Sequence, residues 1–157
     1  MFRSIQILDS SVYLIILKVP KHSGVQDEPG VYNYWHKVIE DAYINNDRII
    51  IPLGVIVEVG NHIGSALNGR KYEIIDRFIS DVSAALDGEK PYSIGELPDA
   101  DGLRRWLISF KDQALSNVEF GDLTCIEEFN KCLKLFPNKP IMIWSTDEHL
   151  KSYKYEP

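Results

Sequence analysis

The sequence predicts an α/β domain with three layers, α/β/α, in which helices cover both faces of a short, mostly parallel central sheet. Three short apolar runs, at residues 5–8, 48–51 and 141–144, have the length and composition of buried strands. The segments between them carry apolar residues at the three-and-four spacing of amphipathic helices. Strands that alternate with helices in this way build a mainly parallel sheet with helices on both faces.

Length and composition predict one domain, residues 1–157, with 45% hydrophobic and 25% charged residues and a core that needs no disulfide. No apolar run reaches the ~20 residues that cross a bilayer, and the first residues lack the pattern of a signal peptide. We therefore expect a cytoplasmic protein with no membrane partner. Cys125 and Cys132 lie seven apart in one expected helix, roughly 10 Å along its axis, and are expected to be reduced core thiols.

The first half of the chain contains two of the predicted strands, and a helix follows each of them. After residues 19–30, which have the composition of a loop, the helical spacing resumes. The expected elements are a strand at 5–8, a short buried helix at 12–18, a helix at 31–46, a strand at 48–51 and a helix from Pro52 to between 64 and 67.

The second half is expected to be mainly helical and to end in the last buried strand. Asp87-Gly88 and Pro137 have the composition of helix ends. The expected elements are a helix at 71–86, a short strand at 92–94, a helix at 103–115 preceded by Pro98-Asp99, a helix at 120–135, a strand at 141–144 and an edge strand within 151–155.

Two acidic residues follow predicted strands. Asp9 ends the first strand and Asp147 comes shortly after the last buried one. Parallel strands end at the same edge of a sheet, where open α/β sheets bind their ligands, so both carboxylates are placed for chemistry. Each also has an ordinary interpretation as a helix cap or turn residue, and Ser145-x-x-Glu148 matches a capping box.

Two further acids lie on predicted helices. Glu58 lies inside an apolar stretch, residues 55–59, where an unpaired charge costs several kcal/mol. A salt bridge to a buried base is the alternative, but no Lys or Arg lies within four residues of it on that helix. Asp122 follows Gly121 at the start of a late helix, where capping is the ordinary interpretation.

Together the four acids predict a metal site. Carboxylates crowded at one sheet edge repel each other unless a divalent cation neutralises them, and hard oxygen ligands suit Mg²⁺ or Mn²⁺ rather than Zn²⁺. Such ions activate water and stabilise the leaving oxygen of a displacement at phosphorus. The net charge of −6 argues against a generally basic surface, but metal ions and a local basic strip can supply the positive charge that nucleic acid needs.

Four short motifs occur in order along the chain. They are Asp9-Ser10-Ser11 after the first strand, Pro52 to Glu58 after the second, Gly121-Asp122 opening a late helix, and Ser145-Thr146-Asp147 after the last buried strand. In this order and at this spacing they resemble PIN-domain ribonucleases, and among these the toxins of VapBC-type toxin–antitoxin pairs. The resemblance covers essentially the whole chain and implies a PIN-like fold.

The resemblance also implies a function and a set of site residues. It implies that Asp9, Glu58, Asp122 and Asp147 are the catalytic, metal-binding acids of an endoribonuclease that uses Mg²⁺ or Mn²⁺ and leaves a 5′-phosphate. It places the accompanying hydroxyls, which we expect to contact the substrate, on Ser10 or Ser11 and on Ser145, where Thr is commoner in the family. RNA is the implied substrate, and a cognate antitoxin protein and a homodimer are the implied partners.

Phosphate contacts are expected from basic residues near the crevice. Chain position favours Arg70 and Lys71. Further candidates are Lys18, Lys21 and Lys151, with Tyr13, His62 and His149 as local contributors, although most of these are expected to be solvated or structural.

Three other functions have sequence requirements that differ from those of the nuclease. A PIN-like domain with a silent site, acting as a protein- or RNA-binding module, is the main alternative, but such a role gives no reason to keep four uncompensated carboxylates together. A phosphatase of the Asp-x-Asp kind would need an acid at Ser11. A dinucleotide binder would need a glycine-rich turn after the first strand, where Asp9 and two serines stand.

Overall fold

The computed structural model describes residues 1–20, 29–66 and 71–157, and in these residues five strands form one sheet in the order β3-β2-β1-β4-β5. The four strands from β1 to β4 are parallel, and β5 is antiparallel to β4. The predicted α/β class with a mostly parallel sheet is therefore confirmed. The strand bounds are β1 Ile5–Leu8, β2 Arg48–Ile51, β3 Tyr92–Ile94, β4 Ile141–Trp144 and β5 Lys154–Tyr155.

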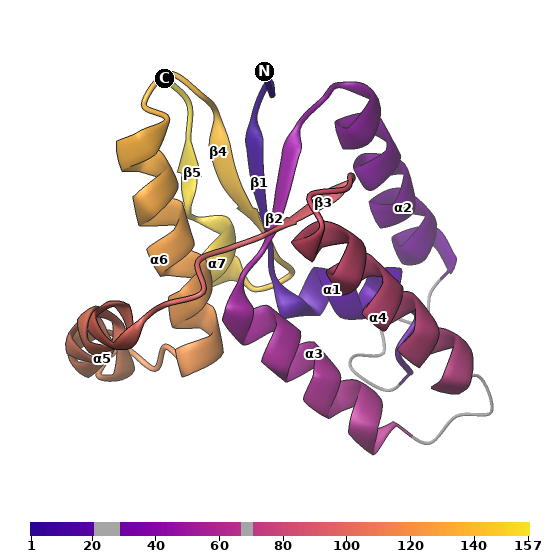
Figure 1. Cartoon of the computed structure of the whole chain (residues 1–157), viewed down its shortest axis with the longest axis horizontal. Helices are drawn as coiled ribbons and strands as arrows, with labels where there is room; N and C mark the ends of the chain where they lie inside the picture. Colours follow the sequence, from indigo (N-terminus) through magenta and orange to yellow (C-terminus); the bar gives the residue numbers. More distant parts are fainter. Residues whose placement is uncertain (21–28, 67–70) are drawn as a thin grey trace.

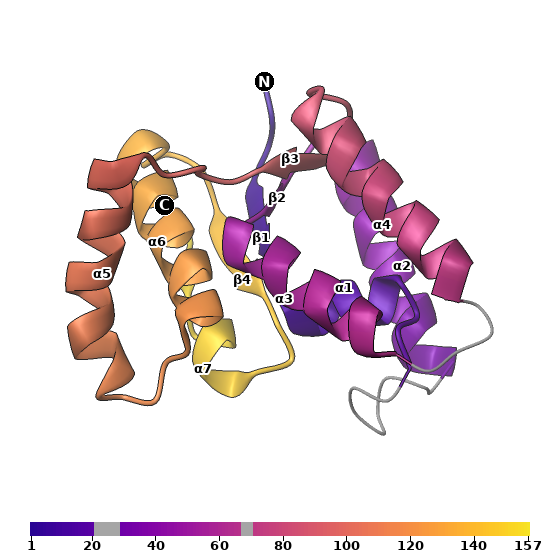
Figure 2. The same cartoon turned by 60° about the horizontal axis from the view of Figure 1, so that its bottom comes forward.

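Helices lie on both sides of this sheet. In Figure 2, α5 and α6 lie on one side of the strands and α2 and α4 on the other, whereas α1 and α3 lie near the ends at which β1 and β2 finish (Figures 1 and 2). The connection from β3 to α5 passes from one side of the sheet to the other (Figure 1). The helix bounds are α1 Ser10–Ile16, α2 Pro29–Ile44, α3 Leu53–Ser65, α4 Lys71–Leu86, α5 Ala100–Ala114, α6 Phe120–Leu135 and α7 Glu148–Lys151.

The central strands form the core because most of their residues are apolar and buried, with Gln6 in β1 and Arg48 in β2 as the polar exceptions. All four residues of β1 are buried, and Ile5, Ile7 and Leu8 are completely inaccessible to solvent. Parallel strands covered on both faces have this continuous apolar composition, and each fully buried Ile or Leu stabilises the fold by about 1.5–3 kcal/mol. The burial thus fixes β1 at the centre of the sheet and places the residue after it, Asp9, at the sheet's carboxyl edge.

Most expected helices occur close to their predicted bounds, with differences at the ends. The first helix begins at Ser10 rather than residue 12, α5 begins at Ala100 rather than residue 103, and the short helix α7 was not expected. Helix ends depend on capping contacts as well as on apolar spacing, and the side chain of Asp99 caps α5 by accepting a bond from the Gly102 amide at 2.8 Å.

Both cysteines are free and buried on α6, as expected. Burial raises the pKa of the Cys132 thiol to about 12 and that of Cys125 well above its usual value, so both thiols are protonated and unreactive at neutral pH. No helix within the described ranges has the length and apolar character needed to span a bilayer.

Candidate carboxylate site

Asp9 holds the N-cap position of α1, but its carboxylate does not cap that helix. Instead it accepts hydroxyl hydrogen bonds: Ser11 Oγ and Ser145 Oγ each donate to Oδ2 at 2.7 Å, and Ser10 Oγ lies 3.5 Å from Oδ1. The residue is only 4% exposed. The capping interpretation of Asp9 is therefore wrong, and three hydroxyls fix its carboxylate at the sheet's carboxyl edge.

The same hydroxyls join the end of β1 to the loop after β4. Ser11 Oγ accepts the amide of Thr146 at 3.0 Å, and the Asp9 amide donates to the carbonyl of Trp144 at 3.0 Å. Ser145 is buried, with 2% of its surface exposed. The hydroxyls predicted from the sequence thus lie around Asp9. Their hydrogen bonds hold the Asp9 carboxylate in place.

Asp147 lies at this edge too, but its carboxylate serves as a helix cap. It is the N-cap of α7, and its Oδ1 accepts the Leu150 amide at 3.0 Å. The capping box between Ser145 and Glu148 does not form, because the Ser145 hydroxyl donates to Asp9 and accepts the Asp147 amide. The alternative interpretation of Asp147 as a helix cap is therefore confirmed. Its second oxygen, Oδ2, takes no part in the capping bond.

Glu58 is less buried than its apolar neighbours suggested. Its side chain is 36% exposed, and His62, one turn further along α3, places Nε2 3.8 Å from Oε1. Burial raises the pKa of the Glu58 carboxyl and the charge of Asp9 adds to this, whereas a hydrogen bond from Ser10 and the neighbouring His62 act in the opposite direction. The expectation of a deeply buried charge is wrong because one face of α3 borders a pocket rather than the core.

Asp122 lies in the first turn of α6, whose N-cap is Glu119, so the predicted capping role is wrong. Partial burial, together with the charges of Asp9, Glu58, Glu119 and Asp147, raises the pKa of the Asp122 carboxyl to about 6. The largest charge effects on this residue therefore all come from acids. Three elements, β1, α3 and α6, contribute carboxylates that repel one another.

Two glycines allow α3 and α6 to approach closely beside these acids. A Cβ at Gly54 would lie 2.5 Å from Thr124 Oγ1 and 3.0 Å from the backbone of Gly121. A Cβ at Gly121 would lie 2.9 Å from Glu58 Oε2. Any side chain at either position would therefore alter the spacing between Glu58 and Asp122.

The donor set of this site fits a hard divalent cation. Carboxylate and hydroxyl oxygens from Asp9, Glu58, Asp122 and Ser10 are the groups that Mg²⁺ and Mn²⁺ prefer. Among ion pairs joining described residues, none connects a Lys or Arg to these three acids. Within the described residues no three His, Cys, Asp or Glu side chains are arranged as a ready-made metal site.

Most of the expected phosphate-binding groups have other contacts. Lys71 Nζ donates to the Gly64 carbonyl at 2.9 Å, Lys18 lies over the ring of Tyr32, and Lys151 pairs with Glu148 at 2.8 Å. Arg70 and Lys21 lie outside the described residues.

The two other local candidates have structural contacts. Tyr13 is fully buried, and its hydroxyl donates to Asp81 at 3.3 Å, so the role suggested for it near the substrate is wrong. His149 packs edge-on against the ring of Tyr153.

Sequence reasoning missed two features near the acids. Glu119 adds a further carboxylate to those acting on Asp122. A pocket of about 800 Å³ adjoins the site and is lined by residues of α3, α5 and α6, including Glu58, Glu119 and Gly121. Its apolar walls come from segments far apart in the chain, so no local pattern signals it.

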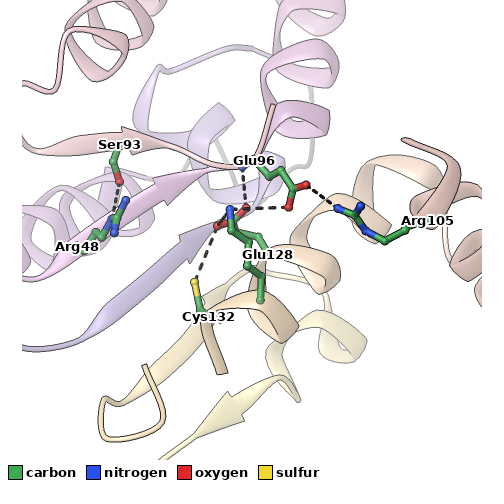
Figure 3. Close-up of polar contacts among 7 residues, drawn as sticks. Arg48, Ser93, Glu96, Arg105, Glu128 and Cys132 are labelled. Carbon is green, nitrogen blue, oxygen red and sulfur yellow. Dashed lines mark hydrogen bonds and ion pairs between the residues drawn. The ribbon is translucent and has the colours of Figure 1, made fainter. Parts of the chain in front are cut away.

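A second acidic network, on the same helix, serves the fold. Glu128 is 6% exposed, and its Oε2 accepts the Glu96 amide at 2.8 Å (Figure 3). Lys131 Nζ lies 3.6 Å from its Oε1, and the Cys132 thiol lies 3.9 Å from the same atom. Arg105 pairs with the Glu96 side chain at 3.3 Å. The network attaches the connection between β3 and α5 to α6.

No family model matches the chain, and no solved structure matches it significantly.

Proposed function

We propose that the protein is an endoribonuclease that depends on Mg²⁺ or Mn²⁺ and hydrolyses RNA phosphodiester bonds. The observation that carries the proposal is the convergence of Asp9, Glu58 and Asp122 from three elements, where the strongest charges acting on Asp122 are negative. Such a group is stabilised by a divalent cation. The order of its motifs, which resembles PIN-domain ribonucleases, supports RNA as the substrate.

In this proposal each residue has a distinct task. Asp9, held by its three hydroxyl contacts, presents Oδ1 as the fixed ligand, because the two short bonds occupy Oδ2. Glu58 and Asp122 complete the ligand set from α3 and α6. Asp147, whose Oδ2 is not used in the cap, orients water at the rim. The bound ion would activate water and stabilise the charge that develops on the leaving oxygen.

A raised pKa at Asp122 adds a condition to this scheme. Half of the metal-free Asp122 is protonated at a pH of about 6, so a cation competes with a proton for this carboxylate. Activity should therefore fall as the pH decreases toward 6 and recover at higher metal concentration.

The test is cleavage of a labelled single-stranded RNA of mixed sequence by the purified protein, with Mg²⁺, Mn²⁺ or EDTA. We expect cleavage with either metal, a 5′-phosphate on the product and no cleavage in EDTA. Asp9→Asn and Asp122→Asn should each reduce the rate by at least a hundredfold, whereas Asp101→Asn, whose side chain is 79% exposed on α5, should not. Wild-type rates in the two site variants would refute the proposal.

We further propose that the nuclease acts in the cytoplasm as the toxin of a toxin–antitoxin pair, restrained by a cognate antitoxin, and that it pairs as a homodimer. Two free cysteines agree with a reducing compartment. Expression of the wild type alone should arrest growth and expression of Asp9→Asn should not. Harmless wild-type expression would remove the toxin role while leaving the nuclease proposal to the cleavage assay.

A further inference from the structure

The pocket beside the carboxylates shares part of its wall with them. Glu58 and Gly121 line it, and Gly121 immediately precedes Asp122. Its volume of about 800 Å³ falls within the ~300–1,000 Å³ range of pockets that bind small ligands. A molecule held at the carboxylates would therefore have space for a neighbouring group on the far side of Glu58.

The chemistry of the walls limits what this space accepts. Asn61, His62 and Thr124 supply uncharged or weakly basic polar groups, Glu58 and Glu119 supply negative charge, and no Lys or Arg lies among the described residues that line the pocket. Phosphate would be repelled here. The rest of the wall is apolar and comes from Leu53, Val57, Leu97, Pro98, Leu103, Trp106 and Phe120.

Much of this apolar surface is open to solvent. Val57 is 56% exposed, Leu97 58% and Leu103 43%, while Trp106 behind them is 4% exposed. A single exposed apolar side chain is ordinary, but three around one pocket mark a surface that binds another molecule.

The wall belongs to a defined part of the fold. Leu97 lies in the connection between β3 and α5, which the Glu128 carboxylate holds through the Glu96 amide (Figure 3). The outer wall is thus attached to α6, the helix that also carries Asp122. The position of the pocket relative to the carboxylates is therefore fixed by the fold.

We propose that this pocket receives an unstacked base next to the scissile phosphate, an inference that rests on the proposed nuclease function. A base is uncharged, with apolar faces and polar edges, which matches apolar walls with an amide at Asn61 that can both donate and accept hydrogen bonds. The scissile phosphate would lie at the carboxylates, and the adjacent base would turn past Glu58 into the pocket. Bases stacked inside a duplex cannot enter, so duplex RNA should be a poor substrate.

The experiment removes one base at a time. Cut sites are first mapped on a single-stranded RNA of mixed sequence with Mn²⁺, and an abasic ribose is then placed at each nucleotide flanking one cut site. At one flanking position we expect kcat/KM of the wild type to fall at least tenfold, the scale of stacking one base on protein side chains. No loss at any flanking position would overturn the inference.

Two exposed wall residues provide the matched variants. Val57→Gln and Leu103→Gln should keep the wild-type Tm, lower kcat/KM on intact RNA at least fivefold through KM, and show little further loss with the abasic RNA. Ile108→Gln, at a 74% exposed position on α5 outside the pocket, should behave as the wild type.

The outcomes separate the two proposals. If the wild type cleaves RNA but both wall variants match it on intact RNA, the base-binding inference is refuted and the apolar wall serves another occupant, such as a protein helix, while the nuclease stands. If the wild type cleaves no RNA with either metal, the nuclease proposal fails and the base site fails with it.

Discussion

Two carboxylates on helix α6 have opposite surroundings. Glu128 is nearly inaccessible, yet it receives the Glu96 amide at 2.8 Å and has Lys131 3.6 Å away (Figure 3). Asp122, in the first turn of the same helix, has Asp9, Glu58 and other acids as the main charges acting on it. Among the described residues, Glu128 thus has compensating partners, whereas the main charges acting on Asp122 are all negative.

The difference fits a role of Glu128 in the fold and the role in ion binding that we propose for Asp122. A buried carboxylate that serves the fold needs donors and a nearby cation, since otherwise its desolvation would destabilise the native state. Repelling carboxylates also destabilise the native state, so a cation from solution is the simplest compensation. The following changes test this contrast, beginning with the largest expected effect.

Removal of the compensated acid should destabilise the protein most. Glu128→Ala leaves the Glu96 amide and Lys131 without their carboxylate and opens a void beside Cys132, so we expect the free energy of unfolding to fall by about 2–4 kcal/mol. Urea unfolding at pH 7 measures it. Asp122→Ala, on the same helix, should lose less than about 1 kcal/mol because a repelling charge disappears. A larger loss of unfolding free energy for Asp122→Ala than for Glu128→Ala would contradict the assignment of Glu128 to the fold.

A smaller effect is expected from a substitution that moves Glu58 without removing an acid. In Gly121→Ala the new methyl group meets Glu58 Oε2, which lies 2.9 Å from the Cβ position, so the flexible carboxylate must shift. We expect unfolding stability within about 1 kcal/mol of the wild type but Mn²⁺ affinity lowered at least threefold, measured by calorimetric titration.

Gly64→Ala is the matched control, because nothing lies within 4 Å of its Cβ position on α3. It should leave Mn²⁺ affinity unchanged. Equal Mn²⁺ affinity in the Gly121→Ala and Gly64→Ala variants would show that the position of Glu58 does not matter to the ion.

The last prediction concerns the pH dependence of stability. The pKa of Asp122 is about 6 in the folded protein and 3.8 in the unfolded chain, so the folded state binds more protons between these values. Relative to Asp122→Asn, the wild type should be most stable below pH 4, lose stability as the pH rises to about 6, and stay constant above. Chemical unfolding of both proteins across this range measures the difference. A difference that does not vary with pH would mean that Asp122 has an ordinary pKa.

The fold was largely predictable because its central strands have a recognisable apolar composition. β1, β2 and β4 are buried on both faces, which requires continuous apolar runs such as Ile141–Trp144. The short helix α7 was missed because its start depends on which side chain is free to cap it. Ser145 is occupied by Asp9, 136 residues away in the chain, and Asp147 therefore caps instead.

For the candidate site, the sequence could name acids but not their surroundings, and their role in binding an ion stays a prediction. Strand ends and an acid within an apolar stretch pointed to Asp9 and Glu58, but the exposure of Glu58 depends on where α5 and α6 lie. The partner of Glu128 could not be predicted either, because its main donor, the Glu96 amide, lies 32 residues earlier, in the connection between β3 and α5. Contacts of this kind follow from tertiary packing rather than from local pattern.

Direct binding of Mn²⁺ tests the central claim, that the carboxylates around Asp122 take up a divalent cation. Calorimetric titration at pH 7.5 should show saturable binding by the wild type, at least tenfold weaker binding by Asp122→Asn, and unchanged binding by Glu128→Gln, whose acid belongs to the fold. Absence of Mn²⁺ binding in the wild type, or equal binding in Asp122→Asn, would contradict it.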